Sequence, residues 1–297
     1  MRGRDVVRLL DDDALAELGR DPVERVRDAI ERGDHPAAAD LAARARRGWA
    51  RGIDGFRVWI VHTLAFLTDR FGATEAGVAL GELSLVTAAW VPWGEAGTAS
   101  PPTGTELLDD LRSDEAVARA EHDRWLDAVC ALLSHVYRTH GIDALQEAIV
   151  YAGDQTLLAW LPEDIARDPV VRVRTWAGML QGNFATVRVE EDHASFTITQ
   201  DPCGSCGRQL AAGRHPGPFD HATVHEVHPI TFERGGVPVY RTHVAVMHFL
   251  VPEARIGAPW PVVACPRGLD AAPCRVRLYK DPLDPAAHAD ADALRDP

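Results

Sequence analysis

Two cysteines separated by two residues carry the strongest chemical signal in this sequence. Cys203 and Cys206 lie within the stretch D-P-C-G-S-C-G-R, residues 201–208. A Cys-x-x-Cys pair in a turn of Pro and Gly allows two thiolates to converge on one ion at about 2.3 Å. Zinc takes about four nitrogen or sulfur ligands, so two more must come from elsewhere in the chain. The pair therefore predicts a metal site, and zinc is the expected ion.

The histidines that follow this pair are the expected source of the missing ligands. Eight of the 13 histidines lie beyond residue 190. His225 and His228, three residues apart, and His243 are the nearest candidates. Cys265 and Cys274 are nine residues apart, a spacing that does not match a second zinc knuckle. Inert structural cysteines and a redox dithiol stay open as alternatives, although the βαβ context of a thioredoxin is missing.

Catalytic and substrate-binding roles can be assigned around this predicted ion. Glu226 is a candidate general base beside a metal-bound water, and His243 is a second candidate catalytic residue. The stretch H-E-V-H at residues 225–228 lacks the spacing of the helical H-E-x-x-H motif, so that motif is rejected. Arg208 and Arg241 are available to bind a substrate carboxylate.

Charge and composition limit the classes of partner. The chain has 297 residues, with 44 acidic and 31 basic side chains and a formal net charge of −13. This balance disfavours nucleic acid and anionic membrane surfaces as partners. No apolar run reaches the ~18 residues that a membrane span needs, and no signal peptide is recognised. We expect a reduced, cytoplasmic protein with a small-molecule partner, and the sequence allows a homodimer.

The first half of the chain predicts helices. Residues 54–72 and 114–139 are apolar at helical spacing, and these stretches stop at Gly72 and Gly141. An offset of 69 residues places one stretch on the other, and an Ala-rich helical segment follows each. A duplicated helical hairpin and two unrelated core helices with similar ends both fit this pattern.

The second half predicts strands. Alternation at residues 186–190 and 195–199 indicates a hairpin, and residues 261–265 and 275–279 indicate two further strands. Residues 239–251 fit either a helix or a strand. We therefore predict an α+β fold in which a helical N-terminal domain precedes a smaller mixed β domain that carries the Cys/His cluster. The expected bounds are 1–165 for the helical domain, 166–285 for the Cys/His domain and 286–297 for a frayed tail.

Five stretches of the chain carry a recognisable pattern: residues 201–208, 228–229, 236–243, 257–259 and 274–282. Together they resemble an uncharacterised family of soil-bacterial proteins. The chain is also similar, more distantly, to L-2-amino-thiazoline-4-carboxylic acid hydrolase-like proteins. Arg241 and Val244 stand where the family carries cysteines, and Cys206 stands where it carries glycine. The resemblance implies a hydrolase-like role on a small molecule.

The leading hypothesis from the sequence is a zinc-dependent enzyme that hydrolyses a small molecule. In it, Cys203, Cys206 and one or two of His225, His228 and His243 hold the ion, and an open position activates water. One alternative is a non-enzymatic protein that binds a small molecule or a partner and has a structural zinc site. Another is an enzyme with Cys203 as nucleophile and His243 as base. A closed set of four ligands favours the structural site, and three ligands plus water favour the metalloenzyme.

Overall fold

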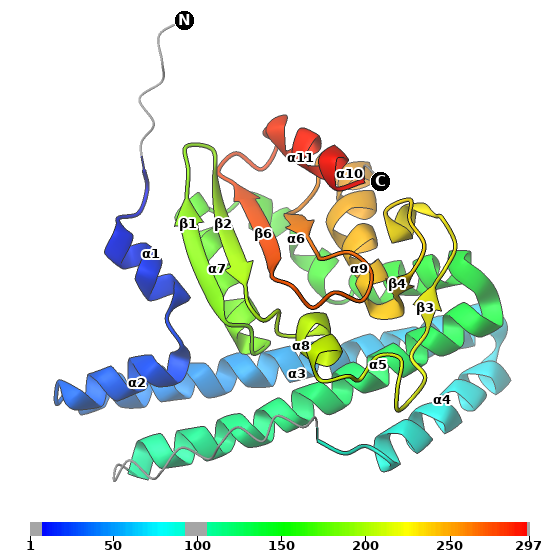
Figure 1. Cartoon of the computed structure of the whole chain (residues 1–297), viewed down its shortest axis with the longest axis horizontal. Coiled ribbons are helices and arrows are strands. Elements are labelled where there is room, and N and C mark those ends of the chain that lie inside the picture. The colour runs from blue at the N-terminus through cyan, green and yellow to red at the C-terminus, as the bar shows by residue number, and fades with distance from the viewer. Residues whose placement is uncertain (1–7, 93–105, 296–297) are drawn as a thin grey trace, which may run out of the picture.

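A helical N-terminal half is the dominant feature of the fold (Figure 1). The computed structural model describes residues 8–92 and 106–295. The Pro and Gly residues at positions 91–104 predict a loop, and residues 93–104 of it lie outside the described part. Between residues 20 and 150, every described element is a helix, as the sequence predicts. The bounds are α1 (Asp12–Gly19), α2 (Pro22–Glu31), α3 (His35–Phe71), α4 (Ala73–Ala88) and α5 (Glu106–Gly153).

Caps and buried stripes explain where these helices form. The carboxylate of Asp21 accepts hydrogen bonds from the backbone N–H groups of Val23 and Glu24, and Pro22 occupies the first turn of α2. The long helices α3 and α5 pack along one another, and α4 lies against both. No helix among the described residues is both long and apolar enough to cross a membrane.

Two glycines break the long helices in the same way. Gly72 separates α3 from α4 with φ 96° and ψ 161°, and Gly141 interrupts α5 with φ 86° and ψ −178°. Residues that carry a side chain rarely adopt positive φ, so glycine is the favoured residue at both breaks. The two glycines are the positions that the 69-residue offset relates, and each joins a long helix to a shorter one. A duplicated hairpin and two unrelated core helices with similar ends both fit these breaks, so the duplication stays a prediction.

The second half of the chain is a mixture of short helices and strands. The helical elements are η1 (Leu157–Trp160), α6 (Leu161–Ile165), α7 (Pro169–Gly182), α8 (Cys206–Ala211), η2 (Pro229–Thr231), η3 (Val239–Arg241), α9 (Thr242–Ala245), η4 (Val246–Leu250), α10 (Val251–Ile256) and α11 (Ala286–Arg295). The strands are β1 (Val187–Glu191), β2 (Ser195–Gln200), β3 (Thr223–Val224), β4 (Val237–Pro238), β5 (Val262–Ala264) and β6 (Cys274–Tyr279).

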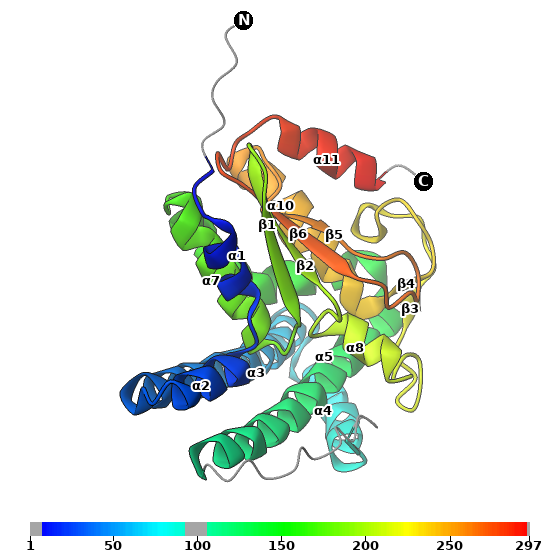
Figure 2. The ribbon, with the colours of Figure 1, turned by 60° about the vertical axis from the view of Figure 1, so that its left-hand side comes forward.

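The main sheet is antiparallel and has the order β1-β2-β6-β5, while β3 and β4 form a separate pair. The hairpin predicted at residues 186–199 is β1 and β2, and the two later predicted strands are β5 and β6. Helices α1 and α7 lie beside β1 (Figure 2). Val187 and Val189 of β1 are buried, whereas Arg188 and Glu190 between them are exposed, as the alternation predicts.

In three regions the structure either differs from the sequence expectation or decides between two expectations. Residues 239–256 are helical, which settles the ambiguity at residues 239–251. Residues 286–295, expected to be frayed, form α11, because Ala287 and Ala291 are buried and the helix contacts β5. One hydrophobic core continues across the expected boundary at residue 165, from Leu10 to Ala291.

Candidate metal centre

The sheet register gathers cysteines at one end. Gln200, the last residue of β2, pairs with Cys274, the first residue of β6, and the chain reaches Cys203 three residues later. On the other side of β6, Ala264 of β5 pairs with Arg275, so Cys265 follows directly beside Cys274. Antiparallel pairing thus brings together cysteines that lie far apart in the sequence.

Four cysteine sulfurs form a ring at this end of the sheet. The sulfur atoms of Cys265 and Cys274 are 3.4 Å apart. Side-chain interactions that shift their pKa values also pair Cys203 with Cys206, Cys203 with Cys274, and Cys206 with Cys265. All four are free cysteines, and three of them are buried while Cys265 is half-buried. We call these four residues the cysteine quartet.

The turn that carries the first two members is shaped around the Cys203 sulfur. The backbone N–H groups of Ser205 and Gly207 donate hydrogen bonds to it. A Cβ atom at Gly207 would lie 2.9 Å from the Cβ of Cys203, so only glycine fits there without displacement. Helix α8 begins at Cys206 immediately after this turn.

Hydrogen bonds within the quartet shift the pKa values of its members in opposite directions. Donation from Cys206 and Cys274 lowers the pKa of Cys203 well below its ordinary value. The same two donors lower the pKa of Cys265. Conversely, the contacts to Cys203 and Cys265 raise the pKa values of Cys206 and Cys274. The lowered pKa values of Cys203 and Cys265 favour the thiolate, which is the form of cysteine that binds metal.

Arg241 joins the quartet to the loop between β5 and β6. Its Nε lies 3.5 Å from the sulfur of Cys206. Its Nη1 donates to the carbonyl oxygens of Pro266 and Gly268 at 3.0 and 2.6 Å, and its Nη2 to that of Asp270 at 2.5 Å. The guanidinium, expected to bind a substrate carboxylate, is here directed at a sulfur and at three backbone carbonyls.

Helix α8 ties the quartet to the helical half. The other arginine expected to bind substrate, Arg208, donates to both carboxylate oxygens of Asp123 on α5 at 2.8 Å. The neighbouring Gln209 donates to Asp127 at 2.8 Å. Both aspartates are buried. Buried bidentate pairs of this kind fix orientation, so Arg208 has a positioning role in this structure.

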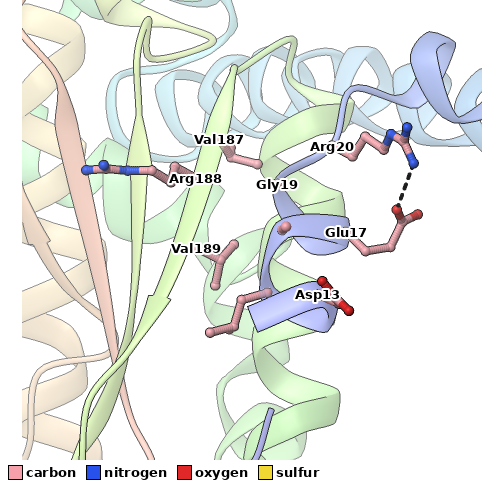
Figure 3. Close-up of a pocket in the computed structure, with 9 residues that line it drawn as sticks. Asp13, Glu17, Gly19, Arg20, Val187, Arg188 and Val189 are labelled. Atoms are coloured by element: carbon pink, nitrogen blue, oxygen red, sulfur yellow. Dashed lines mark ion pairs between the residues drawn. The ribbon is translucent and has the colours of Figure 1, made fainter. Parts of the chain in front are cut away.

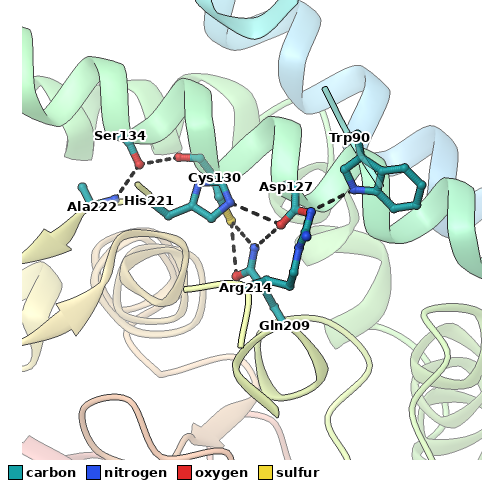
Figure 4. Close-up of polar contacts among 8 residues, drawn as sticks. All are labelled: Trp90, Asp127, Cys130, Ser134, Gln209, Arg214, His221 and Ala222. Atoms are coloured by element: carbon teal, nitrogen blue, oxygen red, sulfur yellow. Dashed lines mark hydrogen bonds and ion pairs between the residues drawn. The ribbon is translucent and has the colours of Figure 1, made fainter. Parts of the chain in front are cut away.

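Asp127 is the centre of a buried polar network (Figure 4). Besides Gln209, it accepts hydrogen bonds from Nη2 of Arg214 at 3.1 Å, Nε1 of Trp90 at 3.1 Å and Nε2 of His221 at 3.2 Å. A buried carboxylate requires such partners, because burial without them is costly. The network fastens the segment after α8 onto α5.

His243 lies near the quartet without a contact to it. Burial lowers its pKa, while the charges on Cys265 and Cys203 act in the opposite direction. Its Nδ1 is hydrogen-bonded to the carbonyl oxygen of Tyr240, and its ring packs edge-on against Trp59. Its role as a metal ligand or catalytic base stays a prediction.

The remaining expected site residues lie on the loop between β3 and β4. Glu226 accepts a hydrogen bond from the hydroxyl of Tyr137, and its neighbour His225 is exposed. His228 accepts from the backbone N–H of Ile230 at 3.3 Å and faces Asp143 at 3.5 Å. Within residues 8–92 and 106–295, none of these three side chains is hydrogen-bonded to the quartet. The cysteines Cys265 and Cys274 occupy the positions beside Cys203 and Cys206 instead.

A second cluster of potential ligands lies in the helical half. The ligand atoms of Glu75, His135 and His140 all lie within 4.8 Å of one another, a condition that no other set of three or more such residues meets in the described part of the chain. The sulfur ring is therefore wider than this cluster. A tetrahedral zinc ion with bonds of about 2.3 Å holds its sulfurs about 3.8 Å apart. Metal binding would therefore shorten the widest separations in the ring and lengthen the 3.4 Å separation between Cys265 and Cys274.

A groove of about 540 Å³ lies between α1 and β1 (Figure 3). Its walls include Asp13, Glu17, Arg20 and Val189. Arg20 and Glu17 form an ion pair of 3.5 Å between groups that are both about half exposed. The groove contains none of the cysteine quartet and none of the predicted catalytic residues.

No protein-family model, curated protein or solved structure matches the chain. The suspected similarity to the hydrolase-like proteins therefore stays a prediction. The chemistry of the side chains is what supports a function.

Proposed function

We propose that the cysteine quartet binds one zinc ion and that this ion has a structural role. The observation that carries the proposal is the closed ring of Cys203, Cys206, Cys265 and Cys274 around one end of the sheet. Four cysteine ligands are the donor set of structural zinc sites, which leave no position for a catalytic water. The corresponding function is that of a non-enzymatic binding protein with a structural zinc site.

The electrostatic surroundings of the quartet support this assignment. Four thiolates with one Zn²⁺ carry a net charge of −2. The Arg241 guanidinium at Cys206 and the N–H groups of Ser205 and Gly207 at Cys203 offset that charge. Donors of this kind orient metal ligands and tune their affinity.

The position of the quartet supports a structural role. Its members come from the turn after β2, from the first residue of α8, from the end of β5 and from the start of β6. An ion at this point would fasten the sheet to α8, whose Arg208 and Gln209 bind α5. Loss of the ion would therefore loosen the junction between the helical half and the sheet.

Elemental analysis joined to thermal unfolding tests the proposal. We expect the quartet of wild type to hold one zinc ion and the double variant Cys265→Ser, Cys274→Ser to lose that ion, with a lowered Tm. The matched control is Cys130→Ser, which changes a buried cysteine outside the quartet. Wild-type protein that is free of zinc yet insensitive to chelators would refute the structural role. Rapid alkylation of Cys203 in zinc-loaded protein would favour the cysteine-nucleophile alternative.

Zinc-dependent hydrolysis of a small molecule is the second candidate. The lowered pKa of His243 keeps its imidazole neutral near pH 7, as a metal ligand or a general base requires. This candidate needs one cysteine to leave the ion and His243 or water to replace it. Retention of zinc by wild type together with a mixed sulfur and nitrogen coordination shell would favour hydrolysis over the structural site.

A further inference from the structure

The helical half contains a compact set of two imidazoles and a carboxylate. Oε1 of Glu75, on α4, lies 2.8 Å from Nε2 of His135 and 3.0 Å from Nε2 of His140. The two histidines lie on α5, just before its break at Gly141. The three ligand atoms therefore converge on one point from two helices.

A second carboxylate completes the surroundings of His135. Its Nδ1 lies 2.9 Å from Oε2 of Glu82, which lies about two turns after Glu75 on the same face of α4. Both ring nitrogens of this buried imidazole thus face carboxylate oxygens, which only accept hydrogen bonds. A cation in place of one ring proton would satisfy the carboxylate on that side. A carboxylate on one nitrogen and a metal on the other is the arrangement that orients metal-binding histidines.

The set is held by rigid elements. The ring of Phe71, the last residue of α3, stacks on the imidazole of His140 with 3.7 Å between centroids and 9° between planes. Gly72, next in the chain, turns the backbone so that α4 places Glu75 against both histidines. Phe71 and His140 are also the positions that the 69-residue offset relates, and each directly precedes the glycine at which its long helix breaks.

We propose that Glu75, His135 and His140 form a second metal site, which binds a divalent transition-metal ion such as Zn²⁺ or Co²⁺. Glu82 is the positioning residue that fixes the orientation of His135. Imidazole with carboxylate suits these borderline ions, whereas the all-sulfur quartet suits zinc. A tetrahedral ion with bonds of about 2.0–2.1 Å separates its ligand atoms by about 3.3 Å, close to the spacings present here.

Three protein ligands leave at least one coordination position for water or a small ligand. The set is reachable from solvent, since the side chains of Glu75 and Glu82 are 23% and 59% exposed. Unlike the quartet, the proposed site therefore has an open coordination position that solvent or a small ligand can reach.

Calorimetric titration with Co²⁺ of the full-length protein loaded with one equivalent of zinc, which occupies the quartet, tests the proposal. Zinc in the quartet resists exchange because cobalt forms weaker complexes than zinc. Wild type should take up one equivalent of Co²⁺. Glu75→Gln and His140→Ala should abolish that uptake, and Glu82→Gln should weaken it about 10–100-fold, as expected for a group that orients a ligand. The matched control is His225→Ala, which removes an exposed histidine outside the cluster and should bind as wild type does.

The outcomes separate a metal site from an ion-pair network. No uptake by wild type, or unchanged uptake in both Glu75→Gln and His140→Ala, would overturn the proposal. Cobalt–thiolate charge-transfer absorption would place the cobalt in the quartet and would also count against it. Thermal melts identify any variant that fails to fold. Glu82→Gln, at an exposed position, keeps the test decisive if the variants of the ligands themselves are unstable.

Discussion

The Nε of Arg241 lies 3.5 Å from the sulfur of Cys206, while the rest of its guanidinium holds the loop between Cys265 and Cys274. One side chain thus contacts the first half of the quartet and positions the second half. Arg241 comes from η3, outside the sheet, so the quartet depends on an element that supplies none of its sulfurs.

Removal of Arg241 should therefore weaken zinc binding without removing a ligand. We expect Arg241→Ala to lower zinc affinity about 10–100-fold, the range typical of residues that orient metal ligands. Competition with a chromophoric chelator measures this change. Arg275→Ala, which removes an exposed arginine next to Cys274, is the control and should retain wild-type affinity. Equal affinity in both variants would show that Arg241 has no such role.

The turn at Gly207 should tolerate no side chain. Gly207→Ala places a Cβ 2.9 Å from that of Cys203, and we expect a loss of about 1–3 kcal/mol in the free energy of unfolding. Zinc affinity should fall as well, since the turn holds Cys203. Gly178→Ala in α7 is the control, because a Cβ there meets nothing within 4 Å and alanine favours helix. Urea unfolding of both variants with and without chelator measures the difference.

The Asp127 network should be a large contributor to stability. Asp127→Ala leaves Arg214, His221 and Gln209 buried without their acceptor, and loss of one partner from a buried ion pair costs about 3–5 kcal/mol. Asp143→Ala, at a side chain that is 90% exposed, should change stability by less than about 0.5 kcal/mol. Denaturant unfolding compares the two, and similar losses would contradict the importance given to the network.

Burial of His248 predicts a specific dependence of stability on pH. Its ring contacts Trp176, and burial lowers its pKa to about 3. Between pH 6.5 and about 3 the unfolded chain binds a proton at this residue that the folded protein does not bind, so stability falls as pH falls through this window. In His248→Gln we expect the slope of unfolding free energy against pH to be smaller by up to about 1.4 kcal/mol per pH unit near pH 5. Identical slopes in the two proteins would show that His248 is not kept neutral.

Local pattern was sufficient to predict much of the fold. The helices before residue 153 follow from apolar spacing, and the β1–β2 hairpin follows from alternation around Asp192. The helix at residues 286–295 is not predictable from local pattern, because its alanines form a helix through contact with β5. The sequence does not show this contact.

The candidate metal site was predicted only in part. The spacing and glycines around Cys203 and Cys206 indicate a knuckle, since that geometry is local. Cys265 and Cys274 were set aside because nine residues separate them. Their partnership depends on strand register, and the one available signal was their place at the ends of two predicted strands. The cluster of Glu75, His135 and His140 depends on how α4 packs on α5, which no local spacing specifies.

X-ray absorption at the zinc edge tests the central claim most directly. Protein loaded with one equivalent of zinc should show a first shell of four sulfur atoms at about 2.3 Å, from Cys203, Cys206, Cys265 and Cys274. A shell that contains nitrogen or oxygen at about 2.0–2.1 Å, or protein that takes up no zinc, would contradict the four-thiolate structural site.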